Sequence, residues 1–201
     1  MSIFETIINH YNSQIDAISR HTEVLTPYIA EAAHLLAHTL QEDGKILCAA
    51  AGHNYAIAQH VCNQLDSLSQ HRPALPCVLL GNSQGMAAAI DQDEEQTQHY
   101  YARQVSALGQ AGDTLLVLAH SGQEKNLIHA IQAANHRGLS ILLINSSDHC
   151  LASIANANHV SIDLNEVDKA QALSLQFITL TLLVELTEQL LFGHIEWNLT
   201  L

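Results

Sequence analysis

Apolar residues change their spacing part-way along the chain. In the first 43 residues they recur three or four positions apart, as at Ile7 and Tyr11, which is typical of amphipathic helices. Because Pro27 suits the first turn of a helix, this segment predicts two helices, the second ending at Asp43-Gly44. We expect these two helices to pack on each other, on the last helix or on another subunit.

After residue 44, short continuous apolar runs alternate with helix-length segments. The runs are Ile46–Ala51, Cys77–Leu80, Thr114–Ala119, Leu139–Asn145 and His159–Ile162. Their unbroken hydrophobicity is typical of parallel strands that are buried on both faces. The segments between and after them are expected to be helices: Tyr55–Leu68, Gln84–Ile90, Thr97–Leu108, Glu124–His136, Leu151–Ala155 and Val167–Leu191.

This alternation predicts an α/β fold. We expect three layers, with a doubly wound sheet of five parallel strands and extra N- and C-terminal helices. The whole chain, 1–201, is interpreted as a single domain. Within it, 1–43 would be a helical extension, 44–165 the parallel α/β core, and 166–201 a C-terminal helix and tail.

Charge and composition exclude several classes of protein. The chain has 7 Lys and Arg against 20 Asp and Glu, a formal net charge of −13, so direct nucleic-acid binding is not expected. We expect no membrane helix and no secretion signal. The scattered histidines and the four cysteines have no metal-ligand spacing, so neither a metal site nor a cofactor is predicted. The cysteines are expected to be reduced and mostly buried, in a cytoplasmic protein.

Two loops follow predicted strands, at the edge where an open parallel sheet binds ligands. The first loop contains Gly52, His53 and Asn54, and the second runs from His120 to Glu124. Ser121-Gly122-Gln123-Glu124 has the pattern of a capping box. We expect the Ser121 hydroxyl to accept from the amide of residue 124, and the Glu124 carboxylate to accept from the amide of Ser121.

Several segments together resemble the SIS family of sugar-phosphate-binding proteins. They are Gly44-Lys45-Ile46-Leu47, Ala58-Gln59-His60, Arg72-Pro73-Ala74-Leu75-Pro76, Ala102-Arg103-Gln104-Val105, Ala111-Gly112-Asp113-Thr114 and Ser121-Gly122. The branch that the chain is most similar to holds phosphoheptose isomerase and the initiator-associating protein DiaA. The resemblance implies the flavodoxin-like SIS fold and a homo-oligomer, with a tetramer as the family precedent.

The phosphate-binding loops depart from the family pattern. Only Gly52 is kept in the first loop, where His53 and Asn54 follow it, and hydroxyl residues of the second loop are replaced by Ala119, His120 and Glu124. The remnants of a phosphosugar pocket are therefore Gly52, His53, Asn54, His120, Ser121 and Glu124. A carboxylate at a helix N-terminus would repel a second anion. Protonated His53 and His120 would soften that repulsion, which leaves a sugar-phosphate sensor as an alternative.

The resemblance also implies an isomerase site that this chain has only in part. In that branch a glutamate follows the histidine that corresponds to His60, and the last helix supplies a glutamine and a histidine. Here Gln64 stands at the glutamate position and Thr179 at the histidine position, while His60 and Gln171 are kept. An amide and an unassisted hydroxyl are poor acid–base groups and poor zinc ligands. We therefore assign no catalytic residue. A phosphoheptose isomerase with a rearranged site stays open as an alternative.

The end of the predicted last helix is the remaining candidate site. Leu190-Leu191-Phe192-Gly193-His194 resembles the ending of DiaA, which implies that Leu191 and Phe192 contact the replication initiator DnaA. The alternative is that both residues pack on the first helices. Trp197, in the tail, is not accounted for by the resemblance. The resulting hypothesis is a non-catalytic, homo-oligomeric binding scaffold whose repeated partner site raises avidity.

Overall fold

The computed structural model describes residues 2–67, 72–81, 97–146, 150–164 and 167–193. Its helices are α1 (Ile3–Gln41), α2 (Asn54–Asp66), α5 (Tyr100–Leu108), α6 (Lys125–Arg137), α7 (Cys150–Ile154) and α8 (Lys169–Phe192). Its strands are β1 (Ile46–Ala50), β2 (Cys77–Leu79), β3 (Thr114–Ala119), β4 (Ser140–Asn145) and β5 (His159–Asp163). Each strand matches its predicted run to within one residue at either end. The predicted helix Gln84–Ile90 and the tail with Trp197 lie outside the described residues.

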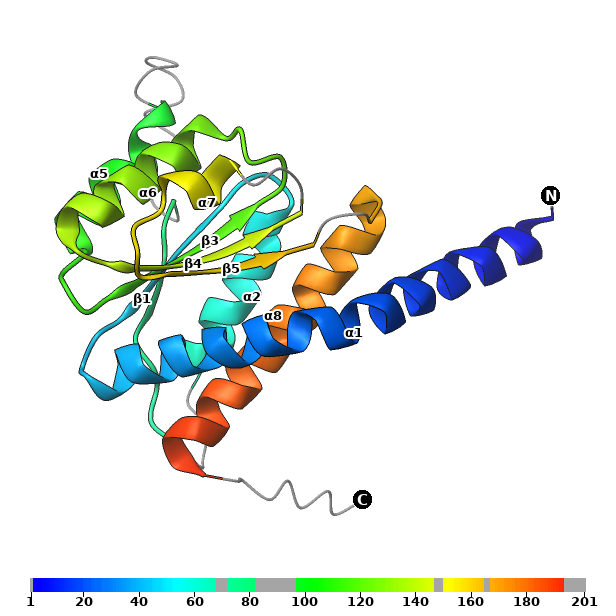
Figure 1. The fold of residues 1–201 in the computed structure, drawn as a ribbon, viewed down its shortest axis with the longest axis horizontal. Helices are drawn as coiled ribbons and strands as arrows, with labels where there is room; N and C mark the ends of the chain where they lie inside the picture. Colours follow the sequence, from blue (N-terminus) through cyan, green and yellow to red (C-terminus); the bar gives the residue numbers. More distant parts are fainter. Residues whose placement is uncertain (1, 68–71, 82–96, 147–149, 165–166, 194–201) are drawn as a thin grey trace.

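The five strands form one parallel sheet in the order β2-β1-β3-β4-β5. Helices α1, α2 and α8 lie on one face, and α5, α6 and α7 lie on the other (Figure 1). The predicted three-layer, doubly wound α/β fold is therefore confirmed. The chain order reverses between β1 and β3, and in such sheets this point places a crevice beyond the carboxyl ends of the strands.

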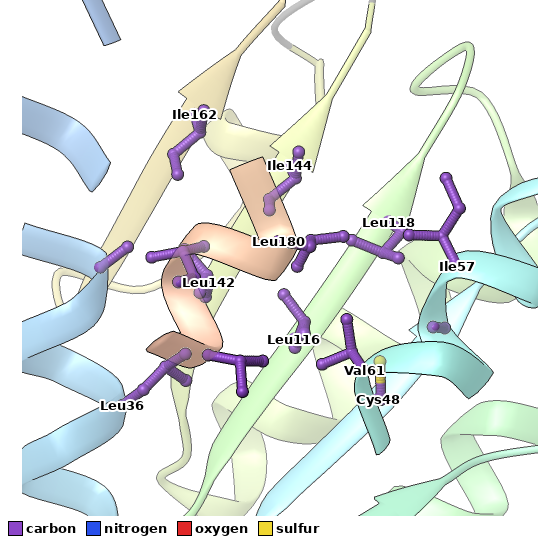
Figure 2. Close-up of a cluster of buried hydrophobic side chains, with 14 of the residues drawn as sticks. Leu36, Cys48, Ile57, Val61, Leu116, Leu118, Leu142, Ile144, Ile162 and Leu180 are labelled. Carbon is purple, nitrogen blue, oxygen red and sulfur yellow. The ribbon is translucent and has the colours of Figure 1, made fainter. Parts of the chain in front are cut away.

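Alternate residues of each strand feed two separate cores, because successive side chains of a strand point to opposite faces. On β3, Leu116 and Leu118 face α1, α2 and α8, where they meet Leu36, Val61 and Leu180 (Figure 2). Their strand neighbours face α5, α6 and α7. Burial on both sides explains why the strand sequences are apolar without interruption.

The N-terminal segment forms one helix, which corrects the prediction of two. Helix α1 runs for 39 residues with Pro27 inside it. A proline in a helix interior costs about 3 kcal/mol through a lost hydrogen bond and a steric clash. Burial of Leu25 and Leu36 in the core shared with α8 contributes about 1.5–3 kcal/mol each. Packing on both sides of Pro27 therefore outweighs the local cost.

A closely packed connection joins α1 to the first strand. The Asp113 carboxylate, which is almost fully buried, accepts from the Lys45 backbone N–H at 2.9 Å and pairs with the Lys45 ammonium at 2.7 Å. A Cβ atom on Gly44 would lie 2.7 Å from the Gly112 carbonyl oxygen and 2.8 Å from the Thr39 carbonyl oxygen. Only glycine fits this approach, so the Gly44-Lys45 and Gly112-Asp113 segments have structural roles.

Helix α8 is the central helix of its layer. Among the described helices it alone is long and apolar enough to cross a membrane, a test that the core helix of a soluble protein also passes. It packs against α1 and α2 and begins with a capping box at Asp168. Glu188, near its other end, pairs with the buried Arg72 at 2.6 Å. These polar ties and the packing are those of a core helix.

Candidate functional site

A cavity of about 290 Å³ lies at the carboxyl ends of β1, β3 and β4, where the chain order of the sheet reverses. The loops after these strands supply most of its wall, and the first turns of α8 close it. The described lining residues are Ala51, Gly52, His53, Asn54, His120, Glu124, Ser146, Ala172, Leu173 and Gln176. Five of the six predicted pocket residues line it; Ser121 lies beside it instead.

The loop after β1 turns sharply into α2. Gly52 has a φ of +58°, a conformation that favours glycine. His53 is exposed at the N-cap of α2 and makes no side-chain capping bond, whereas Asn54 is buried. Behind the loop, the Tyr101 hydroxyl donates to the Ala50 carbonyl oxygen at 2.8 Å, and burial raises the pKa of Tyr101 to about 12. The end of β1 is thereby held in place.

The loop after β3 is organised by Glu124. Its Oε1 atom accepts from the Ser121 N–H at 2.8 Å and from the His120 N–H at 3.0 Å. The carboxylate therefore reaches back as predicted. The other half of the predicted capping box is wrong, because the Ser121 hydroxyl accepts from the N–H of Gln123 at 3.3 Å and α6 begins after Glu124. Gly122, with a φ of +71°, turns the chain so that Glu124 itself is the N-cap residue.

Glu124 is an internal anion. Burial raises the pKa of its carboxyl, but hydrogen bonds from the backbone N–H groups of Ser121, Glu124 and His120 outweigh burial, and the net pKa lies below the ordinary value. Among the described residues that line the cavity there is no lysine or arginine. The amides that would face an incoming anion are thus already bonded to a negative charge of the protein.

Further hydrogen bonds fix the walls of the cavity. His120 Nδ1 lies 3.2 Å from the Ser146 hydroxyl oxygen, and that hydroxyl donates to the His120 carbonyl oxygen at 3.0 Å. Gln176 Nε2 donates to the Ala119 carbonyl oxygen at 3.1 Å, which ties α8 to the end of β3. The sequence did not predict that α8 forms part of the cavity wall, because no local pattern places α8 over this edge of the sheet.

The four residues at isomerase positions all lie outside the described wall of this cavity. The His60 ring is exposed and lies against Phe177, with 5.1 Å between ring centroids. Gln64 is half-buried on α2, and Thr179 is buried on α8. Gln171 completes the α8 capping box through its Oε1 atom and donates from Nε2 to Ser13 on α1. In the described part of the chain, no group of three His, Cys, Asp or Glu residues could hold a metal ion.

The two residues predicted to bind a partner have different surroundings. Leu191 is half-buried and packs against the core beneath α1 and α8. Phe192, the last residue of α8, is 41% exposed, as is Leu190. The structure therefore leaves Phe192 accessible to a partner and gives Leu191 a packing role.

The cysteines form an internal cluster that sequence spacing did not reveal. Cys48 and Cys62 are buried, Cys77 is partly buried, and all three are free thiols, as predicted. The Cys77 thiol donates to the Cys62 sulfur at 2.9 Å, which joins β2 to α2. The strand register brings Cys48 next to β2, a contact that depends on the fold and not on a sequence motif.

Comparisons with known proteins agree with this architecture. The SIS domain family model matches residues 10–146. The phosphoheptose isomerase of Chromohalobacter salexigens is 30% identical over 98% of this chain and 100% of its own length. The DnaA initiator-associating protein DiaA of Citrobacter koseri is 32% identical over 86% of this chain and 88% of its own. The structure of a phosphoheptose isomerase from Francisella tularensis superposes with a TM-score of 0.88 at 25% identity, covering 94% of this chain and 100% of that one.

Proposed function

We propose that this chain, which belongs to the SIS domain family, is a non-catalytic binding scaffold of the DiaA type. It would act as a cytoplasmic homo-oligomer, with a tetramer as the family precedent, and would bind the replication initiator DnaA. The observation that carries the proposal is the pair of hydrogen bonds from Ser121 N–H and His120 N–H to Glu124. The two amides follow the end of β3, at the edge of the sheet where this kind of fold binds ligands. They already donate hydrogen bonds to a carboxylate of the protein.

Electrostatics argue against a sugar phosphate in this cavity. A phosphate placed about 4 Å from the Glu124 carboxylate would be repelled by about 4 kcal/mol at an effective dielectric constant near 20. The described wall offers only the imidazoles of His53 and His120 as cationic candidates. The family's acid–base positions hold Gln64 and Thr179, whose side chains do not exchange protons near neutral pH.

The N-terminal half of α1 supports a homo-oligomer. It extends away from the rest of the domain (Figure 1) and exposes a row of apolar side chains: Ile3, Phe4, Ile7, Ile8, Tyr11 and Ile15. A groove of about 600 Å³ between α1 and α8 continues this surface. Contiguous apolar surface of this kind marks an interaction site, and a second copy of the same helix offers the matching chemistry.

Sedimentation tests the assembly. Ile8→Glu places a charge on the exposed face of α1 and should convert the oligomer to smaller species, while Ser106→Glu, on α5 across the sheet, should not. An unchanged sedimentation coefficient for Ile8→Glu would contradict this interface.

The partner site is tested by binding to purified DnaA. Phe192→Ala should weaken binding about tenfold or more, because a large exposed aromatic is the kind of residue that dominates interfaces. Phe177→Ala is the matched control, since Phe177 lies on the same helix and is 42% exposed, against 41% for Phe192. Equal affinities of wild type and Phe192→Ala, with the oligomer intact, would contradict the proposed site.

Phosphoheptose isomerisation is the second candidate function. The observation that favours it is coverage: the similarity to a phosphoheptose isomerase extends over 100% of that protein, whereas the similarity to DiaA extends over 88% of that one. An assay of purified, metal-supplemented protein with sedoheptulose 7-phosphate decides between them. We expect no turnover above a blank. Turnover that rises with protein concentration and exceeds that of the metal-only blank would replace the scaffold by the enzyme.

A further inference from the structure

Three cysteine side chains meet beneath α2, on the face of the sheet that α1 and α8 also cover. Cys48 lies on β1, Cys62 on α2 and Cys77 on β2, and all three pack in one hydrophobic core. The Cys77 thiol donates to the Cys62 sulfur at 2.9 Å, and the Cys48 thiol is also hydrogen-bonded to Cys62. Cys62 is therefore the central sulfur. In the part of the chain that the structure describes, no three such side chains are placed to hold a metal ion, so a metal does not account for the cluster.

The hydrogen bonds divide the protons unequally between the sulfurs. Those from the Cys48 and Cys77 thiols lower the pKa of Cys62, and they outweigh burial and the nearby Asp66 carboxylate, which raise it. The pKa of Cys77 is raised, first because its proton is held in the hydrogen bond to Cys62 and then by burial. The pair thus combines a thiolate with a neutral thiol. A thiolate is the form of cysteine that peroxides oxidise, and a second thiol beside it can convert the product to a disulfide.

Position in the sheet favours Cys77 over Cys48 as the partner of Cys62. Cys48 is 0% exposed and lies on β1, which pairs with a strand on each side. Cys77 is partly exposed and lies on β2, a three-residue strand at the edge of the described sheet. A disulfide has its sulfurs about 2.05 Å apart, so those of Cys62 and Cys77 would have to approach by about 0.9 Å. A short edge strand yields by that amount more readily than a strand held on both sides.

We propose that Cys62 and Cys77 form a reversible disulfide when the protein meets hydrogen peroxide, and that this bond locks β2 to α2. Because Cys62 is only 6% exposed, the oxidant has to be as small as a peroxide. This redox switch uses neither the cavity nor the Phe192 surface. Its failure and the failure of DnaA binding are therefore distinguishable.

The reaction has two steps. The Cys62 thiolate attacks one oxygen of hydrogen peroxide, so that an S–O bond forms, the O–O bond breaks and hydroxide leaves, which gives a sulfenic acid. The Cys77 sulfur then attacks the Cys62 sulfur; an S–S bond forms, the S–O bond breaks, and the oxygen leaves as water with the Cys77 proton. The two sulfurs lose two electrons to the peroxide, and a dithiol such as dithiothreitol returns them.

Peptide mapping by mass spectrometry tests the proposal. The reduced full-length protein is treated with a slight excess of hydrogen peroxide and then alkylated without reductant. We expect a peptide in which Cys62 is linked to Cys77, and we expect dithiothreitol to remove the link. Free, alkylated Cys62 and Cys77 after this treatment would overturn the proposal. A link between Cys62 and Cys48, or oxidation of Cys62 to a sulfinic acid with no link, would overturn it as well.

Two variants test the order of the steps. Cys77→Ser should leave the sulfenic acid unresolved, so that dimedone, a reagent for sulfenic acids, labels Cys62. Cys62→Ser should give no labelling of Cys77. Cys150→Ser is the matched control, since α7 lies across the sheet, and its link should form as in wild type. Labelling of Cys77 in Cys62→Ser, or loss of the link in Cys150→Ser, would contradict the assignment. If a variant does not fold, the wild-type peptide map still decides.

Thermal unfolding tests whether the bond locks the fold. A disulfide that closes the loop 62–77 restricts the unfolded chain and should raise the thermal midpoint by about 6–12 °C. Dithiothreitol should reverse the rise, and peroxide should give no rise in Cys77→Ser. A midpoint of the oxidised wild type equal to or below that of the reduced protein would contradict the lock.

Discussion

Replacing Glu124 by glutamine tests the internal anion on which the proposed function rests. The wild-type carboxylate accepts two backbone N–H groups, at 2.8 and 3.0 Å. A hydrogen bond to a charged group contributes about 1.5–3 kcal/mol, and one between neutral groups about 0.5–1.5 kcal/mol. Glutamine keeps one acceptor of the same shape but no charge, so each bond should lose about 1 kcal/mol. We expect Glu124→Gln to lower the free energy of unfolding by about 2 kcal/mol at neutral pH.

The same variant predicts a pH dependence whose sign follows from the pKa. Hydrogen bonds from the backbone hold the pKa of Glu124 below its ordinary value in the folded protein, although burial opposes them. The unfolded chain then binds the proton more readily, so the stabilisation is fully present above an unfolded pKa of about 4.3. It is lost as the pH falls through the lower pKa of the folded protein.

Urea unfolding of both proteins at neutral and at acidic pH measures this difference. The gap between wild type and Glu124→Gln should close on acidification, and Glu31→Gln, an exposed control on α1, should match wild type throughout. A gap of the same size at both pH values, or no gap at neutral pH, would refute the assignment of Glu124 as an anion that holds the loop.

Three further substitutions test how the fold is held. Arg72→Met leaves the Glu188 carboxylate without its 2.6 Å partner and should cost about 3–5 kcal/mol, seen as a lower thermal midpoint; a midpoint equal to wild type would contradict the buried ion pair. Gly44→Ala forces a Cβ to within 2.7 Å of a carbonyl oxygen and should cost about 1–3 kcal/mol in urea unfolding, so an unchanged midpoint would show that the junction can relax. Gln171→Ala and Ser13→Ala should be non-additive by about 0.5–1.5 kcal/mol in a double-mutant cycle, because the two side chains bond each other, and strict additivity would remove that contact.

The sheet could be predicted because burial on both faces leaves an unbroken apolar run in each strand. Leu115 and Leu116 are neighbours in sequence but belong to different cores, and both side chains are buried. The continuity of α1 through Pro27 could not be predicted from the sequence. The preference of proline for the first turn of a helix is a local rule, and tertiary packing overrides it here. The apolar spacing around Leu25 and Leu36 fits one helix as well as two. Only the burial of both residues in the core shared with α8 shows that one helix spans them.

The candidate site, like the fold, could be predicted only in part. The spacing of Ser121 and Glu124 predicted that the carboxylate reaches back, because that contact is made within one turn. The second bond, from His120 N–H, depends on the turn at Gly122 and is not encoded in the capping motif. The α8 wall at Gln176 depends on how distant elements meet, so sequence spacing alone could not reveal it.

The positions that carry the family resemblance explain why fold and ligand can diverge. Gly44 fits a close approach, Asp113 holds the junction before β1, and Arg72 ties α2 to α8, and all three act away from the cavity. Asn54 and Glu124, two positions at which the sequence departs from the pattern of the family's phosphate-binding loops, line the cavity. Identity summed over the whole chain counts residues that build the scaffold together with residues that line the site. An activity is carried by the residues of a site, so this identity supports the fold fully, and support for a sugar-phosphate reaction has to come from the cavity wall itself.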